Sequence, residues 1–84
     1  MLIQVSHSRH YAFQEELYNP IKSALFFSEY SWIFPHDGRE VDSKVTLRNV
    51  DLLIAEVSSP TTGNALEIGM ASAYGKRILC IYKK

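Results

Sequence analysis

The segment that decides the fold is residues 51–69, which run DLLIAEVSSPTTGNALEIG. The unbroken apolar middle of 51–57 is typical of a strand buried on both faces in a parallel sheet. Residues 58–63 are rich in Ser, Pro, Thr and Gly, which predicts a loop. A helix is then expected from about Asn64 to Tyr74, because Gly75 suits the position just after a helix end.

The residues on either side of this segment continue the alternation of strand and helix. Residues 2–5, 31–34 and 78–82 predict further strands, and 6–10 form a polar loop. A short helix is expected to run to about Asn49, with Asp42 or Ser43 as its cap. Such alternation predicts one three-layer α/β domain over residues 1–84, with about four parallel strands and helices on both faces.

The first helix is predicted by apolar residues that recur every four positions: Phe13, Leu17, Ile21 and Leu25. Pro20 interrupts this stripe, and proline removes one helical N–H and crowds the carbonyl four residues earlier. Two outcomes stay open. The helix kinks at Pro20, or it breaks and restarts with Asn19 as cap.

Composition excludes several classes of protein. The 84 residues are 46% apolar and 21% charged, which is ordinary for a globular domain and argues against disorder. Nine basic residues balance nine acidic ones. A net charge of zero provides no basic field for a phosphate backbone, so a nucleic acid polymer is not expected as a partner.

Cysteine and histidine usage point to a protein without disulfides or bound metal. The single Cys80 excludes a disulfide within the chain, which favours a reducing, cytoplasmic location. We expect no signal peptide and no membrane contact, because no apolar run approaches 18 residues. The spacing of His7, His10 and His36 matches no metal-ligand motif, so neither a metal nor a cofactor is expected.

Polar residues follow three of the four predicted strands, where parallel sheets bind ligands. Glu67 lies close behind one of these loops, at the start of a helix. There, a helix N-terminus would favour an ionised carboxylate, which can act as a nucleophile. The alternative is structural, since Asn64 and Glu67 have the spacing of a capping box.

A family resemblance bears on that choice. Residues 51–63 (DLLIAEVSSPTTG), 66–71 (LEIGMA) and 75–80 (GKRILC) resemble the nucleoside 2-deoxyribosyltransferase family, and especially its 2′-deoxynucleoside 5′-phosphate N-hydrolases. Residues 1–50 share only the strand–loop–helix plan and the position of the first loop. The resemblance implies a flavodoxin-like, or Rossmann-like, fold and chemistry at the N-glycosidic bond.

The resemblance also implies site residues. The family's nucleophilic glutamate falls on Glu67, and a substrate-contacting hydroxyl and a turn glycine fall near the proline of residues 58–63. The first loop of the family wraps the sugar or its phosphate. The substrate-binding candidates are therefore Ser6, His7, Ser8, Arg9, Thr61, Gly63 and the neighbouring Asn64.

The chemistry needs a second group that protonates the leaving base and then deprotonates the acceptor. The family aspartate that assists falls on Ser43 in ungapped register, and Asp42 is one residue away. Asp42 is our candidate for this role, and simple helix capping is the alternative.

The first functional hypothesis is an enzyme that cleaves or transfers at the N-glycosidic bond of (deoxy)nucleosides or their 5′-monophosphates. Water as acceptor would make it a hydrolase, and a second base would make it a transferase. The alternative is a non-catalytic nucleotide-binding module of the same fold. A third hypothesis is an interaction domain that uses the exposed edge of the sheet.

We also expect a homo-oligomer, most simply a two-fold dimer. A core built from 84 residues leaves little surplus over chain entropy, and no disulfide supplements it. Aromatic residues are abundant for so short a chain and are common at interface cores. The predicted helical region around Tyr18 to Tyr30 is apolar on more than one face, so one face would meet another subunit.

Overall fold

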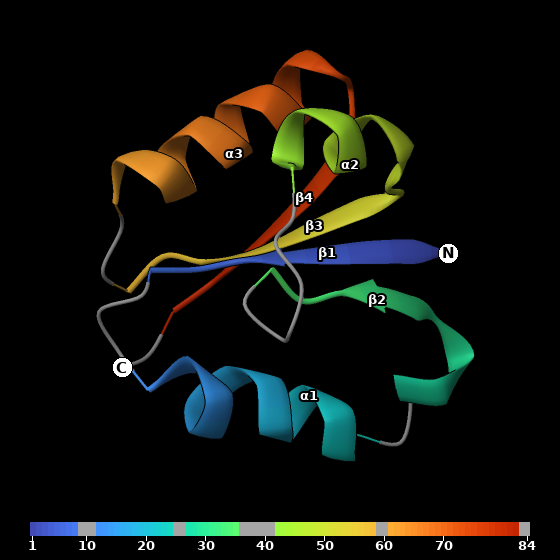
Figure 1. Cartoon of the computed structure of the whole chain (residues 1–84), viewed down its shortest axis with the longest axis vertical. Coiled ribbons are helices and arrows are strands. Elements are labelled where there is room, and N and C mark those ends of the chain that lie inside the picture. The colour runs from blue at the N-terminus through green and yellow to red at the C-terminus, as the bar shows by residue number, and fades with distance from the viewer. Residues whose placement is uncertain (9–11, 25–26, 36–41, 59–60, 83–84) are drawn as a thin grey trace.

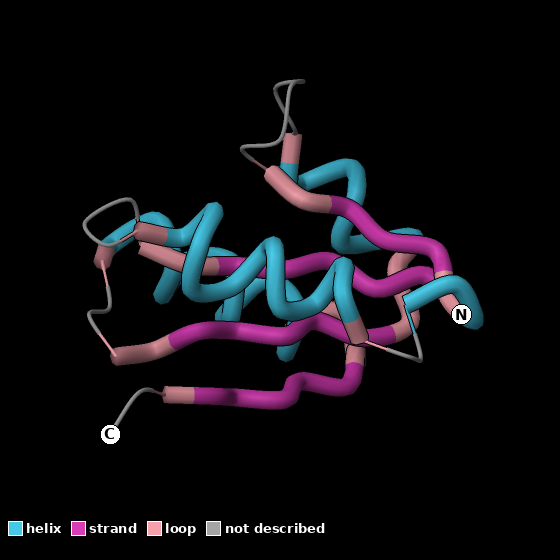
Figure 2. The backbone as a smooth tube through the Cα atoms, turned by 90° about the horizontal axis from the view of Figure 1, so that it is seen from below, coloured by secondary structure: helices cyan, strands magenta, loops and turns pink. Residues whose placement is uncertain are grey.

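The computed structural model describes residues 1–8, 12–24, 27–35, 42–58 and 61–82 (Figure 1). Within them, four strands form one sheet in the order β2-β1-β3-β4. The strands are β1 (Leu2–Ser6), β2 (Ser31–Ile33), β3 (Leu52–Glu56) and β4 (Arg77–Ile81), and every neighbouring pair is parallel. Figure 2 shows them side by side. The predicted α/β class is confirmed, and this strand order is that of a flavodoxin-like sheet.

Helices cover both faces of the sheet (Figure 1). Helices α2 (Ser43–Asn49) and α3 (Thr62–Ala73) lie on one face, and α1 (Asn19–Ser23) lies on the other. The core under α2 and α3 is built on four buried residues: Leu47, Val50, Leu53 and Ala71. The core under α1 is built on Val5, Leu17 and Tyr18. Because side chains alternate along a strand, β1 sends Val5 to one core and its neighbours Gln4 and Ser6 to the other face.

The first helix continues through Pro20. A π-helical turn, η1 (Gln14–Tyr18), leads directly into α1, and Asn19 has helical angles of φ −62° and ψ −44°. The alternative in which the helix breaks and restarts with Asn19 as cap is therefore wrong. A wider turn just before proline fits a residue that has no N–H to donate.

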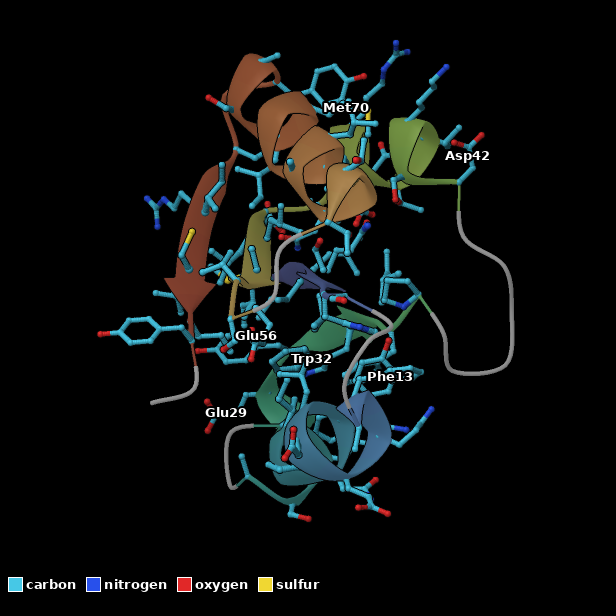
Figure 3. The ribbon with its side chains drawn as sticks, turned by 90° about the vertical axis from the view of Figure 1, so that its left-hand side faces the viewer. Phe13, Glu29, Trp32, Asp42, Glu56 and Met70 are labelled. Atoms are coloured by element: carbon cyan, nitrogen blue, oxygen red, sulfur yellow. The ribbon has the colours of Figure 1, made fainter. Side chains whose placement is uncertain are left out.

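The helical region around Tyr18 to Tyr30 is not one helix. Helix α1 ends at Ser23 because Ala24 is extended, and a short 3₁₀ turn, η2 (Phe27–Glu29), precedes β2. Trp32 of β2 donates its indole N–H to the carbonyl oxygen of Phe27, 2.9 Å away. Part of the predicted apolar surface is thus used inside the molecule, where Trp32 and Phe13 lie between α1 and the sheet (Figure 3).

Helix α3 begins two residues earlier than the sequence indicated. Thr61 is its N-cap, and the hydroxyl oxygen accepts a hydrogen bond from the backbone N–H of Asn64 at 3.3 Å. Gly63 therefore lies in the first turn of the helix and not in the preceding loop. The predicted end is confirmed, since Gly75 has φ +70°, a conformation that favours glycine.

The two faces of β3 are covered unequally. Leu53 and Ala55 are fully buried beneath the α2–α3 layer, whereas Leu52 and Ile54 on the opposite face are half-buried. Burial on both faces, as the sequence predicts, is therefore complete on the α2–α3 side and partial on the other. In the part of the chain that the structure describes, no helix combines the length and the apolar character that a membrane crossing requires.

Candidate functional site

The centre of the candidate site is the carboxylate of Glu67, which three separate elements hold. Ser6, the last residue of β1, donates its hydroxyl to Glu67 Oε1 at 2.8 Å. Ser43, the first residue of α2, donates its hydroxyl to Glu67 Oε2. Gln4 of β1 places its amide nitrogen 3.4 Å from the same oxygen and 3.3 Å from the Ser43 hydroxyl. Both carboxylate oxygens therefore accept hydrogen bonds from side chains of β1 and α2.

The periodicities of strand and helix explain why these side chains meet. Gln4 and Ser6 are two residues apart on β1, so they share the face toward α2 and α3. Asn64 and Glu67 are three residues apart on α3, so they share one side of that helix. Asn64 donates its amide N–H to the Ser6 hydroxyl oxygen at 2.8 Å and completes the cluster. We call Gln4, Ser6, Ser43, Asn64 and Glu67 the Glu67 cluster.

The hydroxyl protons of Ser6 and Ser43 both go to the Glu67 carboxylate. Ser6 has one hydroxyl proton, which goes to Glu67, so its oxygen can only accept from Asn64. Gln4 must present its nitrogen, because its amide oxygen would otherwise face the carboxylate without a proton between them. Charge-assisted hydrogen bonds of this kind are stronger than neutral ones and suit a negatively charged Glu67.

The capping-box interpretation of Glu67 is wrong. Thr61 is the N-cap, so Glu67 lies in the second turn of α3 and not in the first. Its carboxylate accepts from side chains of β1 and α2 instead of reaching back to a helix N–H. Glu67 lies toward the sheet, as expected, since its carboxylate bonds to Gln4 and Ser6 of β1, and its side chain is half-buried.

Asp42 is the N-cap of α2. Its carboxylate accepts from the backbone N–H of Lys44 at 3.0 Å, and its side chain is exposed. Figure 3 shows this carboxylate on the outer side of the helix start. Among the hydrogen bonds of the described residues, none joins Asp42 to Glu67, and it is the neighbouring Ser43 that contacts the carboxylate.

The predicted first loop lies partly at the site. Ser6 belongs to the Glu67 cluster, and His7 and Ser8 are buried just beyond it. The His7 ring lies on the α1 side, stacked on Phe13 and hydrogen-bonded to the Tyr18 hydroxyl. Arg9 lies outside the described residues.

Of the remaining predicted residues, Asn64 belongs to the cluster, and Thr61 caps α3. Gly63 is exposed, and a side chain added there would meet nothing within 4 Å. Close backbone approach within the chain therefore does not explain this glycine.

Two residues of the Glu67 cluster, Gln4 and Ser43, were not among the predicted site residues. Gln4 has a recognisable signal, because it is a polar residue inside an otherwise apolar strand and two positions before Ser6. Ser43 is the position on which the family aspartate falls in ungapped register. The prediction of Asp42 rested on its carboxylate, but it is Ser43 whose side chain contacts Glu67.

A second carboxylate, Glu56, ends β3 and is only 7% exposed. It accepts from the backbone N–H of Ser58 and, at 3.1 Å, from the hydroxyl of the same residue. Among all the described residues, no three His, Cys, Asp or Glu side chains lie close enough together to hold a metal ion.

Comparison with known proteins supports the resemblance to nucleotide N-hydrolases. No family model matches the chain. Over 37 residues, it is 49% identical to a 5-hydroxymethyl-dUMP N-hydrolase of Branchiostoma floridae and 43% identical to that of Homo sapiens. The mouse protein of the same name is 46% identical over 37 residues.

The match covers only part of this chain and only part of each relative. The matched residues are 44% of this chain, and they span 35% of the Branchiostoma protein and 21% of the human and mouse proteins. The predicted resemblance is thus confirmed for one stretch of sequence.

Proposed function

We propose that this chain cleaves or transfers at the N-glycosidic bond of a nucleoside or nucleotide, with Glu67 as the nucleophile. The observation that carries the proposal is the carboxylate of Glu67, which hydrogen bonds from β1 and α2 hold in a fixed position. The partial similarity to hydrolases of a deoxynucleotide 5′-monophosphate supports the same reaction class and favours a phosphorylated substrate.

The reaction would proceed in two displacements at C1′ of the sugar. A Glu67 oxygen forms a bond to C1′, while the bond from C1′ to the base nitrogen breaks and its electron pair leaves with the base. The departing base takes up one proton. An acceptor then attacks C1′, releases Glu67 and gives up a proton. Water as acceptor gives hydrolysis, the reaction named for the relatives, and a second base gives transfer.

We propose Asp42 as the group that moves this proton. Its carboxylate is exposed and lies on the residue next to Ser43, and among the described residues its side-chain hydrogen bond is the cap bond from the Lys44 backbone N–H. A rotation of this side chain would exchange the cap bond for a bond to the leaving base. General acid–base assistance of this kind is worth about 10²- to 10⁴-fold in rate.

Substrate contacts are proposed for the residues around the carboxylate. Ser6 and Asn64 belong to the Glu67 cluster, and Thr61 begins the same helix. The first turn of α3 also presents backbone N–H groups that suit a 5′-phosphate. We therefore propose that the phosphate lies near Thr61 and Gly63 and the sugar near Ser6 and Asn64.

The test is incubation of the protein with 2′-deoxynucleosides, ribonucleosides and their 5′-monophosphates, followed by chromatography for free base. We expect base release by the wild-type protein and none by Glu67→Gln. The same assay with a second base present separates transfer from hydrolysis. If no substrate is cleaved although a nucleotide binds in calorimetry, the chain is a nucleotide-binding module instead.

We further propose that the chain forms a two-fold dimer. Leu79 and Tyr82 are 51% and 67% exposed, and Leu52 and Ile54 are half-buried on the same side of the sheet as Leu79. Sedimentation equilibrium at micromolar concentration tests the idea. We expect twice the chain mass of 9.6 kDa, and a single species at the monomer mass would contradict it.

A further inference from the structure

The two oxygens of the Glu67 carboxylate have different hydrogen-bond partners. Oε2 accepts from two donors, the hydroxyl of Ser43 and the amide nitrogen of Gln4, which lies 3.4 Å away. Among the described residues, Oε1 accepts from one donor, the hydroxyl of Ser6 at 2.8 Å. Each carboxylate oxygen has about two lone-pair sites. Both sites of Oε2 are therefore used, and Oε1 keeps one that can form a bond to carbon.

The donors on Oε2 also hold each other. The Gln4 amide nitrogen lies 3.3 Å from the Ser43 hydroxyl oxygen, so the two donors and Oε2 form one group of mutual contacts. Gln4 is 0% exposed and belongs to β1, which pairs with both β2 and β3. Because side chains inside a protein are closely packed, a residue in this place has little room to move. Oε2 is thus the anchored oxygen of the carboxylate.

Ser6 is placed to respond to the charge on Oε1. Its side chain is fully buried, and its oxygen accepts from the Asn64 amide at 2.8 Å, so its single proton goes to Glu67. A hydrogen bond to an ionised group is about twice as strong as one between neutral groups. The Ser6 hydroxyl therefore stabilises Glu67 more as a carboxylate than as an ester.

We propose that Oε1 is the atom of Glu67 that attacks C1′, and that Ser6 is a catalytic residue which stabilises Glu67 as it leaves the sugar. This inference rests on the proposed function. In the second displacement, the bond from C1′ to Oε1 breaks and its electron pair returns to Oε1, while the acceptor bonds to C1′ and loses a proton. Ser6 keeps its own proton, and its hydrogen bond strengthens as the charge returns. Gln4 is a positioning residue that acts through Oε2.

The two displacements should respond differently when the Ser6 hydroxyl is removed. Their transition states resemble an oxocarbenium ion, so Glu67 is largely ionised in both. The first displacement starts from the carboxylate and loses little. The second starts from the ester and gains the charge-assisted bond on the way, so it slows and the glycosyl-enzyme accumulates. A donor on Oε2 matters less to this balance, because Oε2 becomes the ester carbonyl and continues to accept.

The test measures the ratio of glycosylated to free protein during turnover. The first probe is 5-hydroxymethyl-dUMP, the substrate named for the relatives, and the common 2′-deoxynucleoside 5′-monophosphates follow. Each reaction is quenched with acid in the steady state at saturating substrate, and intact mass spectrometry reads the sugar adduct. We expect Ser6→Ala to raise the ratio by about 5- to 10-fold over wild type. Ser43→Ala and Gln4→Met should lower kcat and change the ratio by less than about twofold.

Three further variants control for packing. Ser6→Thr keeps the hydroxyl and is expected to have the wild-type ratio, whereas a rise equal to that of Ser6→Ala would reject the role of the hydroxyl. Thr46→Val changes a buried hydroxyl of α2 that has no hydrogen-bond partner among the described residues, and kcat and the ratio should stay at their wild-type values. If Ser6→Ala does not fold, Ser6→Cys takes its place, because a thiol is a weak donor.

The outcomes separate this inference from the proposed function. A ratio in Ser6→Ala no higher than in wild type, or a larger rise in Ser43→Ala or Gln4→Met, rejects Oε1 as the attacking atom while cleavage by Glu67 stands. Release of base by Ser6→Ala without any adduct rejects it as well. Release of no base by the wild-type protein from any of the probes overturns the proposed function, and the assignment of Oε1 falls with it.

Discussion

Glu56 and Glu67 are both withdrawn from solvent near the same end of the sheet, but different parts of the chain determine their surroundings. Glu56 bonds to Ser58, two residues away, within its own loop. Glu67 bonds to residues that are 24, 61 and 63 positions away. Because Leu53 faces α2 and α3, the alternation of β3 sends Glu56 to the opposite side of the sheet (Figure 3).

The difference separates a structural carboxylate from a candidate catalytic one. The bonds of Glu56 close a turn, and both acceptor oxygens are used by one neighbouring residue. The bonds of Glu67 come from two strand residues and a helix start, so the position of its carboxylate depends on the whole fold. We therefore expect changes at Glu56 to affect stability and changes at Glu67 to affect activity.

The largest expected effect is that of Glu67→Gln. Removing the nucleophile should lower base release by at least about 10³-fold, because the covalent step is lost. Glu56→Gln makes the same chemical change at the other carboxylate and is the matched control, with base release expected within a few-fold of wild type. Equal losses of activity in both variants, measured by chromatography, would remove the distinction between the two sites.

Asp42→Asn tests proton transfer without disturbing α2. Asparagine caps helices about as well as aspartate, so the fold should be retained. If Asp42 moves the proton, base release falls by about 10²- to 10⁴-fold. An unchanged rate, together with an unchanged melting temperature, would leave Asp42 with helix capping alone.

Ser43→Ala tests whether the long-range bonds position Glu67. The carboxylate loses one of the donors on Oε2, and we expect kcat to fall by about 10- to 100-fold because the attacking oxygen is less well placed. Ser58→Ala removes the corresponding hydroxyl from Glu56 and serves as the control. If both variants retain wild-type kcat in steady-state assays, the positioning role of Ser43 is wrong.

Glu56→Ala addresses the structural side of the comparison. It leaves the N–H of Ser58 without its acceptor, and we expect the free energy of unfolding to fall by about 1–3 kcal/mol. In a domain of this size, each kcal/mol corresponds to a shift of about 4–8 °C in melting temperature. Calorimetry checks this, and a melting temperature equal to that of wild type would show that the turn is held by other contacts.

The smallest expected effect is at the start of α3. Thr61→Ala removes the N-cap acceptor and should cost about 1 kcal/mol, whereas Thr61→Ser retains it. Urea denaturation of the two variants measures the difference. If Thr61→Ala also raises KM for a 5′-monophosphate but not for the nucleoside, Thr61 contacts the phosphate as well. An unfolding free energy equal to that of the serine variant would contradict the capping role.

Much of the fold could be predicted because its signals are local. The apolar run of β3, the capping aspartate of α2 and Gly75 after α3 each depend on residues within one turn or strand. The four predicted strands and helices α2 and α3 are found with shifts of one or two residues at their ends. The main differences are the start of α3, which lies two residues earlier, and the predicted helical region around Tyr18 to Tyr30, in which α1 already ends at Ser23.

The candidate site, in contrast, depends on contacts between residues that are far apart in the sequence. The residue types around Glu67 were visible in the sequence, and the strand order and the period of each element limit which side chains can meet. From the sequence, the charge of Asp42 nevertheless made it the candidate for proton transfer, and Gln4 was not predicted as a site residue. Only the packing of α2 and α3 against β1 turns Ser43 inward and Asp42 outward. Glu67 bonds to Ser6 and Gln4, which are 61 and 63 positions away in the sequence. No local sequence pattern predicts such bonds, because these side chains meet only after the sheet has assembled.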